Sequence, residues 1–313
     1  MSIHNIIITI DCDPDGLSGI TTNRNTNSFK SLEEIQPINQ EINDFFGHHI
    51  PLTWFIRIDN QIEDFFGSCM YLYDFFIVFW KDCLSKKHEL AWHPHLYSNT
   101  NENNEYEIMT NQLEIENTLD YLWRKIKEYD LKIKSFRNGE GWLNSTIINK
   151  LVEFGLKTDS TALPNMSKIG HPMNWIGTPN QPFEMRNTKK DKSIKEKSIL
   201  EIPMNTWNVR ASYDKTAKLR YMNPAIHHEL FVNAVLEWKK ILDINITNEY
   251  FWVFILHPEE VMKSDEIDLL YSKSREIMYQ NIHHFMKSIQ DIGHSYQFLT
   301  LNEATIRWTM NQK

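Results

Sequence analysis

The chain has 313 residues and a mass of 37.3 kDa, and its 41% hydrophobic and 12% aromatic content supplies a large core and excludes a disordered or collagen-like chain. Its 33 Lys and Arg residues are outnumbered by 41 Asp and Glu residues, and a net charge of -8 disfavours general binding of nucleic acid, whose phosphates are also negative. We therefore expect a folded, soluble protein with no nucleic-acid partner.

The cysteine count and the absence of sorting signals point to a cytoplasmic location. Cys12, Cys69 and Cys83 are too few and too scattered for a disulfide scaffold, which favours a reducing compartment. The amino terminus lacks the basic region and small-residue cleavage site of a secretory signal. The most apolar later stretch, 71–80, is half the ~20 residues that a transmembrane helix needs, so we expect a buried helix there.

Short β-rich runs alternate with longer helical patterns along almost the whole chain. Seven runs are short, apolar and rich in β-branched or aromatic residues: 6–10, 53–58, 89–92, 134–136, 156–157, 251–256 and 296–299. Apolar residues at helical spacing predict helices around 119–129, 147–154, 225–242 and 266–290. The alternation predicts an α/β fold with a single (β/α) barrel-like domain over residues 1–313, a distorted TIM-like barrel of seven strands.

Two polar segments interrupt this alternation. Residues 98–105 are rich in Asn and Glu, and residues 187–197 are rich in Lys. Both are expected to be solvated loop excursions from the domain, and neither is assigned a function.

The first predicted strand ends in Asp11-Cys12-Asp13. Side chains alternate along an extended chain, so Asp11 and Asp13 are expected on one face. Adjacent carboxylates repel unless a cation or a proton separates them, and the pair therefore fits a metal ligand beside a general base. A turn in which the aspartates cap backbone amides is the alternative, and the pair alone does not decide between the two.

A second polar cluster ends the third predicted strand, where His93 and His95 flank Pro94. Neutral imidazole is a good ligand for zinc and related ions, and histidines at this spacing can face the same point. One carboxylate with two imidazoles is a borderline-soft ligand set, which predicts one divalent transition-metal ion, zinc.

The remaining predicted strands end in polar residues as well. Arg57 lies at the end of the second strand, Arg137 follows the fourth, Asp159 the fifth and His257 the sixth. Functional residues of β/α barrels gather at the carboxyl ends of the strands, because the loops there form one rim. The joint placement favours a catalytic rim over separate structural roles.

At these positions the chain resembles the polysaccharide deacetylases of the NodB-homology type, carbohydrate esterase family 4. The five family motifs have counterparts, in the family's order, at residues 8–13, 88–95, 136–142, 155–160 and 256–259. The resemblance implies a metal-dependent hydrolase that removes an N-acyl group, acetyl in the first instance, from an amino sugar of a glycan or glycan precursor. The whole chain would then be one NodB-homology deacetylase-like domain with a carbohydrate substrate.

The resemblance also implies a metal site and a base. Asp13, His93 and His95 would hold the divalent metal, and Asp11 would be the general base that takes a proton from the attacking water. The family's second histidine follows the first by four residues, where this chain has Tyr97. His95 is the expected substitute, and the identity of the third ligand stays open.

Further roles follow from the same resemblance. His257 would protonate the departing amine, Arg137 would orient Asp11, and Asp159 would fix the tautomer and charge of His257. Trp92 and Trp142 flank the predicted rim, where their flat faces could stack on a sugar ring as a substrate wall.

Two other interpretations stay open at this point. A non-catalytic glycan-binding barrel is favoured by the altered second motif, whereas the presence of both Asp11 and His257 argues for catalysis. A nucleoside hydrolase also begins with an aspartate-rich calcium loop, but Leu17 and Ser18 stand where two further aspartates would be needed. The sequence identifies neither the sugar, nor the acyl group, nor the oligomeric state.

Overall fold

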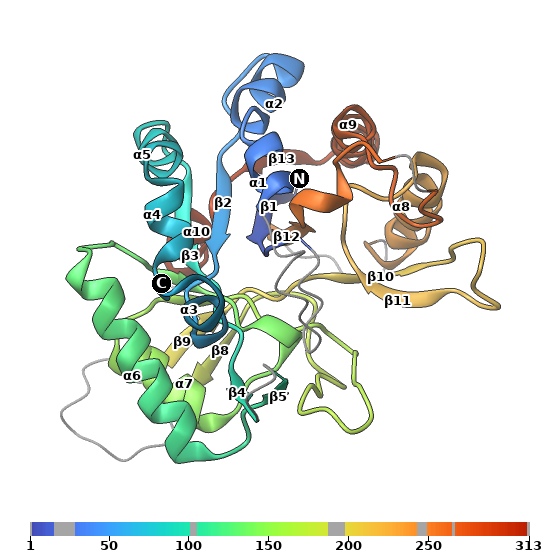
Figure 1. Cartoon of the computed structure of the whole chain (residues 1–313). Helices are drawn as coiled ribbons and strands as arrows, with labels where there is room; N and C mark the ends of the chain where they lie inside the picture. Colours follow the sequence, from blue (N-terminus) through green and yellow to red (C-terminus); the bar gives the residue numbers. More distant parts are fainter. Residues whose placement is uncertain are drawn as a thin grey trace.

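The structure is a computed structural model of the chain, and it describes residues 2–15, 29–100, 105–186, 198–242, 249–264 and 267–311. It is a mixed α/β fold around one curled, largely parallel sheet (Figure 1). The strands of this sheet are β1 Ile3–Cys12, β2 Leu52–Ile56, β3 Glu89–Trp92, β6 Ser135–Phe136, β7 Thr158–Asp159, β8 Phe183–Arg186, β9 Ser198–Glu201, β12 Glu249–Leu256 and β13 Ser295–Phe298. Their order is β12-β1-β2-β3-β6-β7-β9-β8, with β13 also paired to β1.

Helices follow most of the strands. They are α1 Lys30–Ile35, α2 Ile38–Phe46, α3 Asn60–Phe66, α4 Tyr71–Phe75, α5 Ile77–Ser85, α6 Gln112–Glu128, α7 Ser145–Glu153, α8 His228–Leu242, α9 Arg275–Asp291 and α10 Leu301–Asn311, with short 3₁₀ turns η1 Gly139–Gly141 and η2 Pro258–Glu260. In Figure 1, α6 packs beside α7 and α8 beside α9 around the sheet. No helix in the described ranges combines the length and apolar character that crossing a bilayer requires.

Strand β1 is the centre of the sheet and of the core. Its residues are buried from His4 to Cys12, as expected for a parallel strand covered on both faces. One edge pairs with β12 over Ile3–Ile10, while the other pairs first with β13 and then with β2. The N-terminal strand β1 thus pairs with β12 and β13 from the C-terminal part of the chain, and β1 ends in the Asp11-Cys12-Asp13 segment.

The outer edge of β12 is closed by side chains and a loop carbonyl. Alternate N–H groups of β12 donate as follows: Phe251 to Gln181 Oε1 at 2.9 Å, Val253 to Asn205 Oδ1 at 2.6 Å, and Ile255 to the Met222 carbonyl at 3.0 Å. These bonds satisfy an edge that would otherwise be unpaired. The sheet is therefore barrel-like, but its last gap is bridged without a strand pair in the described residues.

The strand count differs from the sequence prediction. The sheet contains nine strands in the described residues instead of seven, because β8 and β9 had been missed. β9 is a four-residue run that ends in Glu201, whose acidic side chain is fully buried and hides the apolar pattern. β7 lies at Thr158–Asp159, two residues beyond the predicted run 156–157, so Asp159 ends the strand instead of following it.

Two hairpins lie outside the main sheet. β4 Tyr97–Asn99 pairs with β5 Tyr106–Ile108, and β10 Thr206–Val209 pairs with β11 Lys218–Tyr221. The first hairpin occupies the described parts of the segment 98–105, which had been expected to be a loop. The predicted excursion 187–197 lies outside the described residues.

Helix boundaries were predicted less well than helix positions. α9 begins at Arg275, nine residues after the predicted start at 266, because Ser274 caps it through Ile277 N–H and Asp268 accepts two N–H groups in a preceding turn. The apolar stretch 71–80, expected to be one buried helix, forms two short helices that meet at Phe76. Only half of its residues are buried, and Phe75 and Val78 are exposed.

Candidate metal and catalytic site

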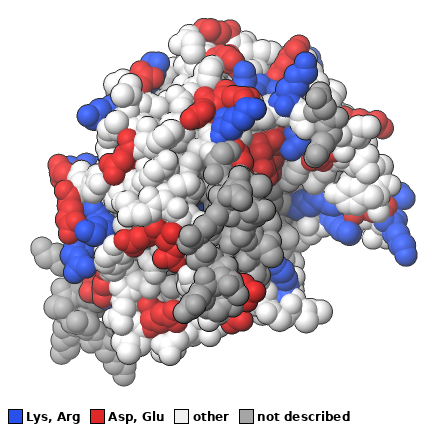
Figure 2. Space-filling model, in the orientation of Figure 1, with Lys and Arg blue, Asp and Glu red and all other residues white. Residues whose placement is uncertain are grey.

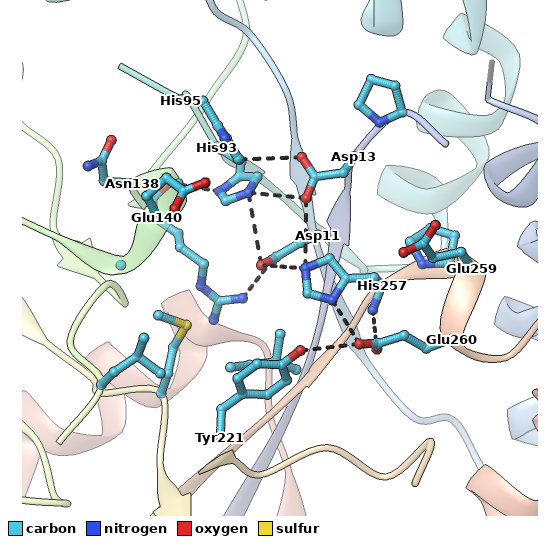
Figure 3. Close-up of a pocket in the computed structure, with 18 of the residues that line it drawn as sticks. Asp11, Asp13, His93, His95, Asn138, Glu140, Tyr221, His257, Glu259 and Glu260 are labelled. Carbon is cyan, nitrogen blue, oxygen red and sulfur yellow. Dashed lines mark hydrogen bonds and ion pairs between the residues drawn. The ribbon is translucent and has the colours of Figure 1, made fainter. Parts of the chain in front are cut away.

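The carboxyl ends of four parallel strands open into a cavity of about 460 Å³. Its polar lining includes Asp11 and Asp13 at the end of β1, His93 and His95 after β3, Arg137 after β6, and His257 after β12 (Figure 3). Parallel strands end at the same edge of a sheet, which is why these distant segments meet. The structure brings six of the nine residues predicted for the site to one place.

Three of these side chains form a possible metal site. One ligand atom from each of Asp13, His93 and His95 lies within 4.8 Å of the others. His95 Nε2 is 3.4 Å from Asp13 Oδ1, and His93 Nε2 is 3.9 Å from Asp13 Oδ2. A carboxylate with two imidazoles on one point is the set that zinc and similar ions bind.

The orientation of His93 is fixed from behind. Its Nδ1 lies 2.9 Å from the Arg137 carbonyl, which can only accept a hydrogen bond, so Nδ1 carries the proton and Nε2 faces the cavity with its lone pair. The His93 N–H donates to the Ile56 carbonyl at 2.9 Å, which extends the strand ladder to this residue. The His93 ring is thus held with Nε2 aimed at Asp13.

The surroundings of His95 also fit a metal ligand. Both ring nitrogens are buried without a hydrogen-bond partner, which is costly unless something else satisfies them. Burial and then the charge of Arg57 lower the pKa of His95 and favour the neutral form that binds metals. A Cβ atom on Gly139 would lie 2.1 Å from His95 Cδ2, so the ring occupies space that only glycine leaves free. The residues present therefore fit a divalent ion.

Arg57 supports the metal site from beneath and was not assigned a role from the sequence. Its buried guanidinium donates to Asp13 Oδ1 at 2.7 Å, Asp59 Oδ2 at 2.6 Å and Gln61 Oε1 at 2.9 Å. Burial alone would raise the pKa of Asp13, but the surrounding groups, the Arg57 charge among them, hold it well below the ordinary value. Asp59 also accepts the backbone N–H of His95 at 3.0 Å, so the Arg57–Asp59 ion pair contacts two of the candidate ligands.

Asp11 has a different environment, although it comes from the same strand face. Its Oδ1 accepts from Arg137 Nη1 at 2.6 Å, and its Oδ2 lies 4.0 Å from Nε2 of both His93 and His257. Arg137 is itself held by Thr9 Oγ1 at 2.9 Å and by Ser160. The contact predicted between Arg137 and Asp11 is thus present, and one carboxylate oxygen stays directed at the cavity.

His257 faces the same point from β12. Its Nε2 is 3.7 Å from Asp13 Oδ2, while Nδ1 lies 3.2 Å from Glu260 Oε1. Burial alone would lower the pKa of His257, but the charge and hydrogen bond of Glu260, followed by Asp11 and Asp13, raise it to about 10. Glu260 also accepts the His257 N–H at 2.8 Å and is fixed by Asn223 at 2.7 Å.

The partner predicted for His257 was wrong. Glu260, three residues further along the chain, occupies the position that the sequence had assigned to Asp159. Asp159 is fully buried at the end of β7, where it accepts from Thr161 Oγ1 at 2.7 Å and lies beside Glu201. The signal for Glu260 was its spacing, because a carboxylate three residues after a histidine can fold back onto it in a single 3₁₀ turn.

The predicted substrate wall was also wrong. Trp92 is 0% exposed, donates to the Ile58 carbonyl at 2.9 Å and packs against Phe136. Trp142 is 2% exposed. Large apolar rings are the strongest contributors to a core, and both indoles serve that purpose instead of facing a ligand.

Fold and site together define a barrel-like α/β protein with a carboxylate and histidine centre at the carboxyl rim. The sequence matches no protein-family profile and no curated protein. Among solved structures, the 4-alpha-glucanotransferase of Thermococcus litoralis is similar with a TM-score of 0.47 and 9% identity over 96% of this chain and 38% of that chain. A structure described as "a putative polysaccharide deacetylase involved in O-antigen biosynthesis", from Bordetella bronchiseptica, gives 0.37 and 13% over 90% of this chain and 82% of that one.

The present chain thus spans 38% of the length of the glucanotransferase. At these TM-scores and identities, neither likeness indicates an activity for this chain. The geometry of the rim and the order of the sequence motifs carry the functional argument.

Proposed function

We propose that this chain is a metal-dependent hydrolase that removes an N-acyl group, acetyl in the first instance, from an amino sugar of a glycan or glycan precursor. The observation that carries the proposal is that the Asp13, His93 and His95 cluster, Asp11 and His257 all face one point of the cavity. A ligand set, a base and an acid around one cavity are the parts that amide hydrolysis requires.

The chain's own residues divide the reaction between them. A divalent ion held by Asp13, His93 and His95 would polarise the amide carbonyl and make water more acidic. Asp11 Oδ2 accepts a proton as the water oxygen bonds to the carbonyl carbon, while Arg137 keeps the other oxygen of Asp11 in place. His257 Nε2 gives its proton to the amide nitrogen as the C–N bond breaks, and Glu260 holds the ring at Nδ1. The products are a free carboxylate and an amine.

We propose zinc as the ion, because one carboxylate and two neutral imidazoles form a borderline-soft set that suits it. The hydrogen bond that fixes the tautomer of His93 and the unpartnered nitrogens of His95 support a ligand role for both rings.

Paired aspartate variants test the proposal. With N-acetylated oligosaccharides as substrates, Asp11→Asn should lower acetate release by about 10²–10⁴-fold while the metal content stays close to that of the parent. Asp13→Asn should instead lose the metal, measured by elemental analysis after dialysis against zinc. Asp15→Asn is the matched control, because Asp15 caps α1 through Ser31 and is absent from the cavity lining.

Equal metal loss in the Asp11 and Asp13 variants would refute the division between base and ligand. A parent protein that binds oligosaccharide but neither holds zinc nor releases acetate would instead support a glycan-binding barrel.

A further inference from the structure

A second cavity lies at the opposite end of β3 from the candidate metal site. His88 precedes this strand and lines the cavity, whereas His93 follows the strand and lines the cavity at the carboxyl rim. The rest of its lining comes from α4, α5, the segment 129–134 before β6, and the start of α10. The volume of this amino-end cleft is about 550 Å³, within the range of small-molecule sites. The two cavities share no lining residue.

The lining of the amino-end cleft contains many apolar side chains. Four of its buried residues are apolar or aromatic: Tyr73, Leu90, Leu131 and Ile133. Leu84 and Tyr129 also line the cleft, yet they are 50% and 40% exposed. Covering such side chains removes apolar surface from water, which is favourable, so the cleft suits a ligand with an apolar body.

Lysines surround this apolar surface. Four of them line the cleft: Lys81, Lys87, Lys132 and Lys134. Lys132 is paired with Asp130, but the other three form no ion pair within the part of the chain that the structure describes. Burial and then the charge of Lys134 lower the pKa of the neighbouring Lys157. Positive charge thus accumulates here without a matching set of carboxylates.

The acidic residues of the lining do not cancel this charge. Besides Asp130 they are Glu89, which accepts from Ser135 Oγ at 2.5 Å, and Glu303, which accepts the Thr300 N–H at 2.8 Å. With all three carboxylates ionised, four lysines leave an excess of one positive charge (4 minus 3), although the whole chain carries -8. Figure 2 shows acidic and basic side chains interspersed over the described part of the viewed face, so the excess is a local property of the cleft.

His88 adds a buried hydrogen-bond donor to the cleft. Its Nδ1 accepts the Leu52 N–H at 3.0 Å, so the proton of the neutral ring is on Nε2. Burial, ahead of the neighbouring charges, lowers the pKa of His88 to about 4 and keeps the ring neutral. Nε2 is buried without a hydrogen-bond partner. A buried donor is unfavourable without an acceptor, and a ligand in the cleft that His88 lines can supply one.

We propose that the amino-end cleft binds a small organic anion. The anionic group, a carboxylate, sulfonate or phosphate, is held by the unpaired lysines and accepts from His88, while the apolar body covers Leu84 and Tyr129. A neutral apolar ligand would leave the lysines without a partner, and a cationic ligand would be repelled by them. The inference does not depend on the proposed hydrolase, because the cleft shares no residue with the carboxyl rim.

Two fluorescent probes of matched shape test the proposal. They are 1-anilinonaphthalene-8-sulfonate and N-phenyl-1-naphthylamine, which has the same ring system without the sulfonate. Fluorescence titration of the parent should give one site for the sulfonate probe and binding of the neutral probe that is weaker by about tenfold. Lys87→Met and Lys134→Met should each weaken binding of the sulfonate probe by about threefold, and the double variant by about tenfold. These losses should shrink at high salt, and binding of the neutral probe should not change.

Lys240→Met is the matched control, because Lys240 pairs with Glu237 on α8 and is absent from the cleft. It should bind both probes as the parent does. Leu84→Ser should weaken both probes by a similar factor, since Leu84 contacts the part that the probes share. All these positions are exposed, and urea unfolding checks that the variants fold.

Equal affinity of the parent for the two probes would overturn the proposal. Binding of the sulfonate probe to the Lys87→Met and Lys134→Met double variant as tightly as to the parent would overturn it as well. Unchanged binding of both probes to Leu84→Ser would refute the placement of the apolar body. Acetate release from the same samples reports on the hydrolase separately, so either proposal can fail while the other stands.

Discussion

Gly139→Ala should weaken metal binding, although the added methyl group is apolar and Gly139 is not a candidate ligand. The new Cβ would lie 2.1 Å from His95 Cδ2, whereas ordinary contacts begin at 3.4 Å, so the imidazole must move by at least 1.3 Å (3.4 minus 2.1). Metal sites hold ligand distances to within about 0.2 Å. The displacement is several times that tolerance, and we expect zinc affinity to fall by about 100-fold, the upper end of the effect of disturbing a supporting residue.

The same substitution should destabilise the fold. The His95 ring is enclosed, so the clash is relieved by shifting packed neighbours, which typically costs about 1–3 kcal/mol in the free energy of unfolding. A double-mutant cycle with His95→Ala isolates this effect, because removing the ring removes the clash. In the His95→Ala background, Gly139→Ala should change neither stability nor zinc affinity appreciably.

Competition with a zinc-binding dye measures the affinity, and urea unfolding of the metal-free proteins measures the stability. Gly139→Ala binding zinc as tightly as the parent would show that His95 is not a ligand. An equal loss of affinity in both backgrounds would show that Gly139 acts through the backbone and not through His95.

Two further substitutions probe buried carboxylates. Glu260→Gln should slow hydrolysis of amides by about 10–100-fold and activated esters far less, because only the amine leaving group needs the proton of His257; an equal loss for both substrates would mean that Glu260 is merely structural. Burial and then the neighbouring Asp159 raise the pKa of Glu201, so its contribution to folding is complete below the ordinary pKa and is lost as the pH rises through the raised value. Glu201→Gln keeps the acceptor for the Ala162 N–H but cannot lose a proton. Urea unfolding of the metal-free proteins at a series of pH values should show that the parent loses up to about 1.4 kcal/mol of unfolding free energy per pH unit and that the variant does not. The same pH dependence of the unfolding free energy in parent and variant would refute this reasoning.

The sequence predicted the sheet where each strand carries its own apolar signal. β1, β2, β3 and β12 were placed within a few residues, since they are largely apolar runs that are mostly buried. β13 was placed as closely, although its residues are only half-buried. β9 failed this test, because a short run that buries Glu201 reads as a polar segment. Its place in the sheet depends on the partner strand β7, which a local pattern does not show.

The polar rim was predictable for a related reason. A strand's end is visible in the sequence, so Asp11, His93, Arg137 and His257 could be placed on one rim without knowing any distance. What each residue contacts across the rim was not visible. Arg57 and Glu260 have their roles only because β2 lies next to β1 and because η2 turns back on itself. Burial of Trp92 and Trp142 likewise depends on what packs above the strands.

Contacts between neighbouring strands also explain why Asp11 and Asp13, on one face of β1, are proposed to have different roles. Each has its own arginine, but the arginines leave different oxygens free. Arg137 takes Oδ1 of Asp11 and leaves Oδ2 directed between His93 and His257, the position from which a proton can be accepted. Arg57 takes Oδ1 of Asp13 at the point nearest His95, which keeps that carboxylate ionised among two imidazoles, as a ligand must be. Exchanging the two proposed roles would require exchanging the strands that supply the arginines, so the proposed division between base and ligand depends on the order β1-β2 and β3-β6 of the sheet.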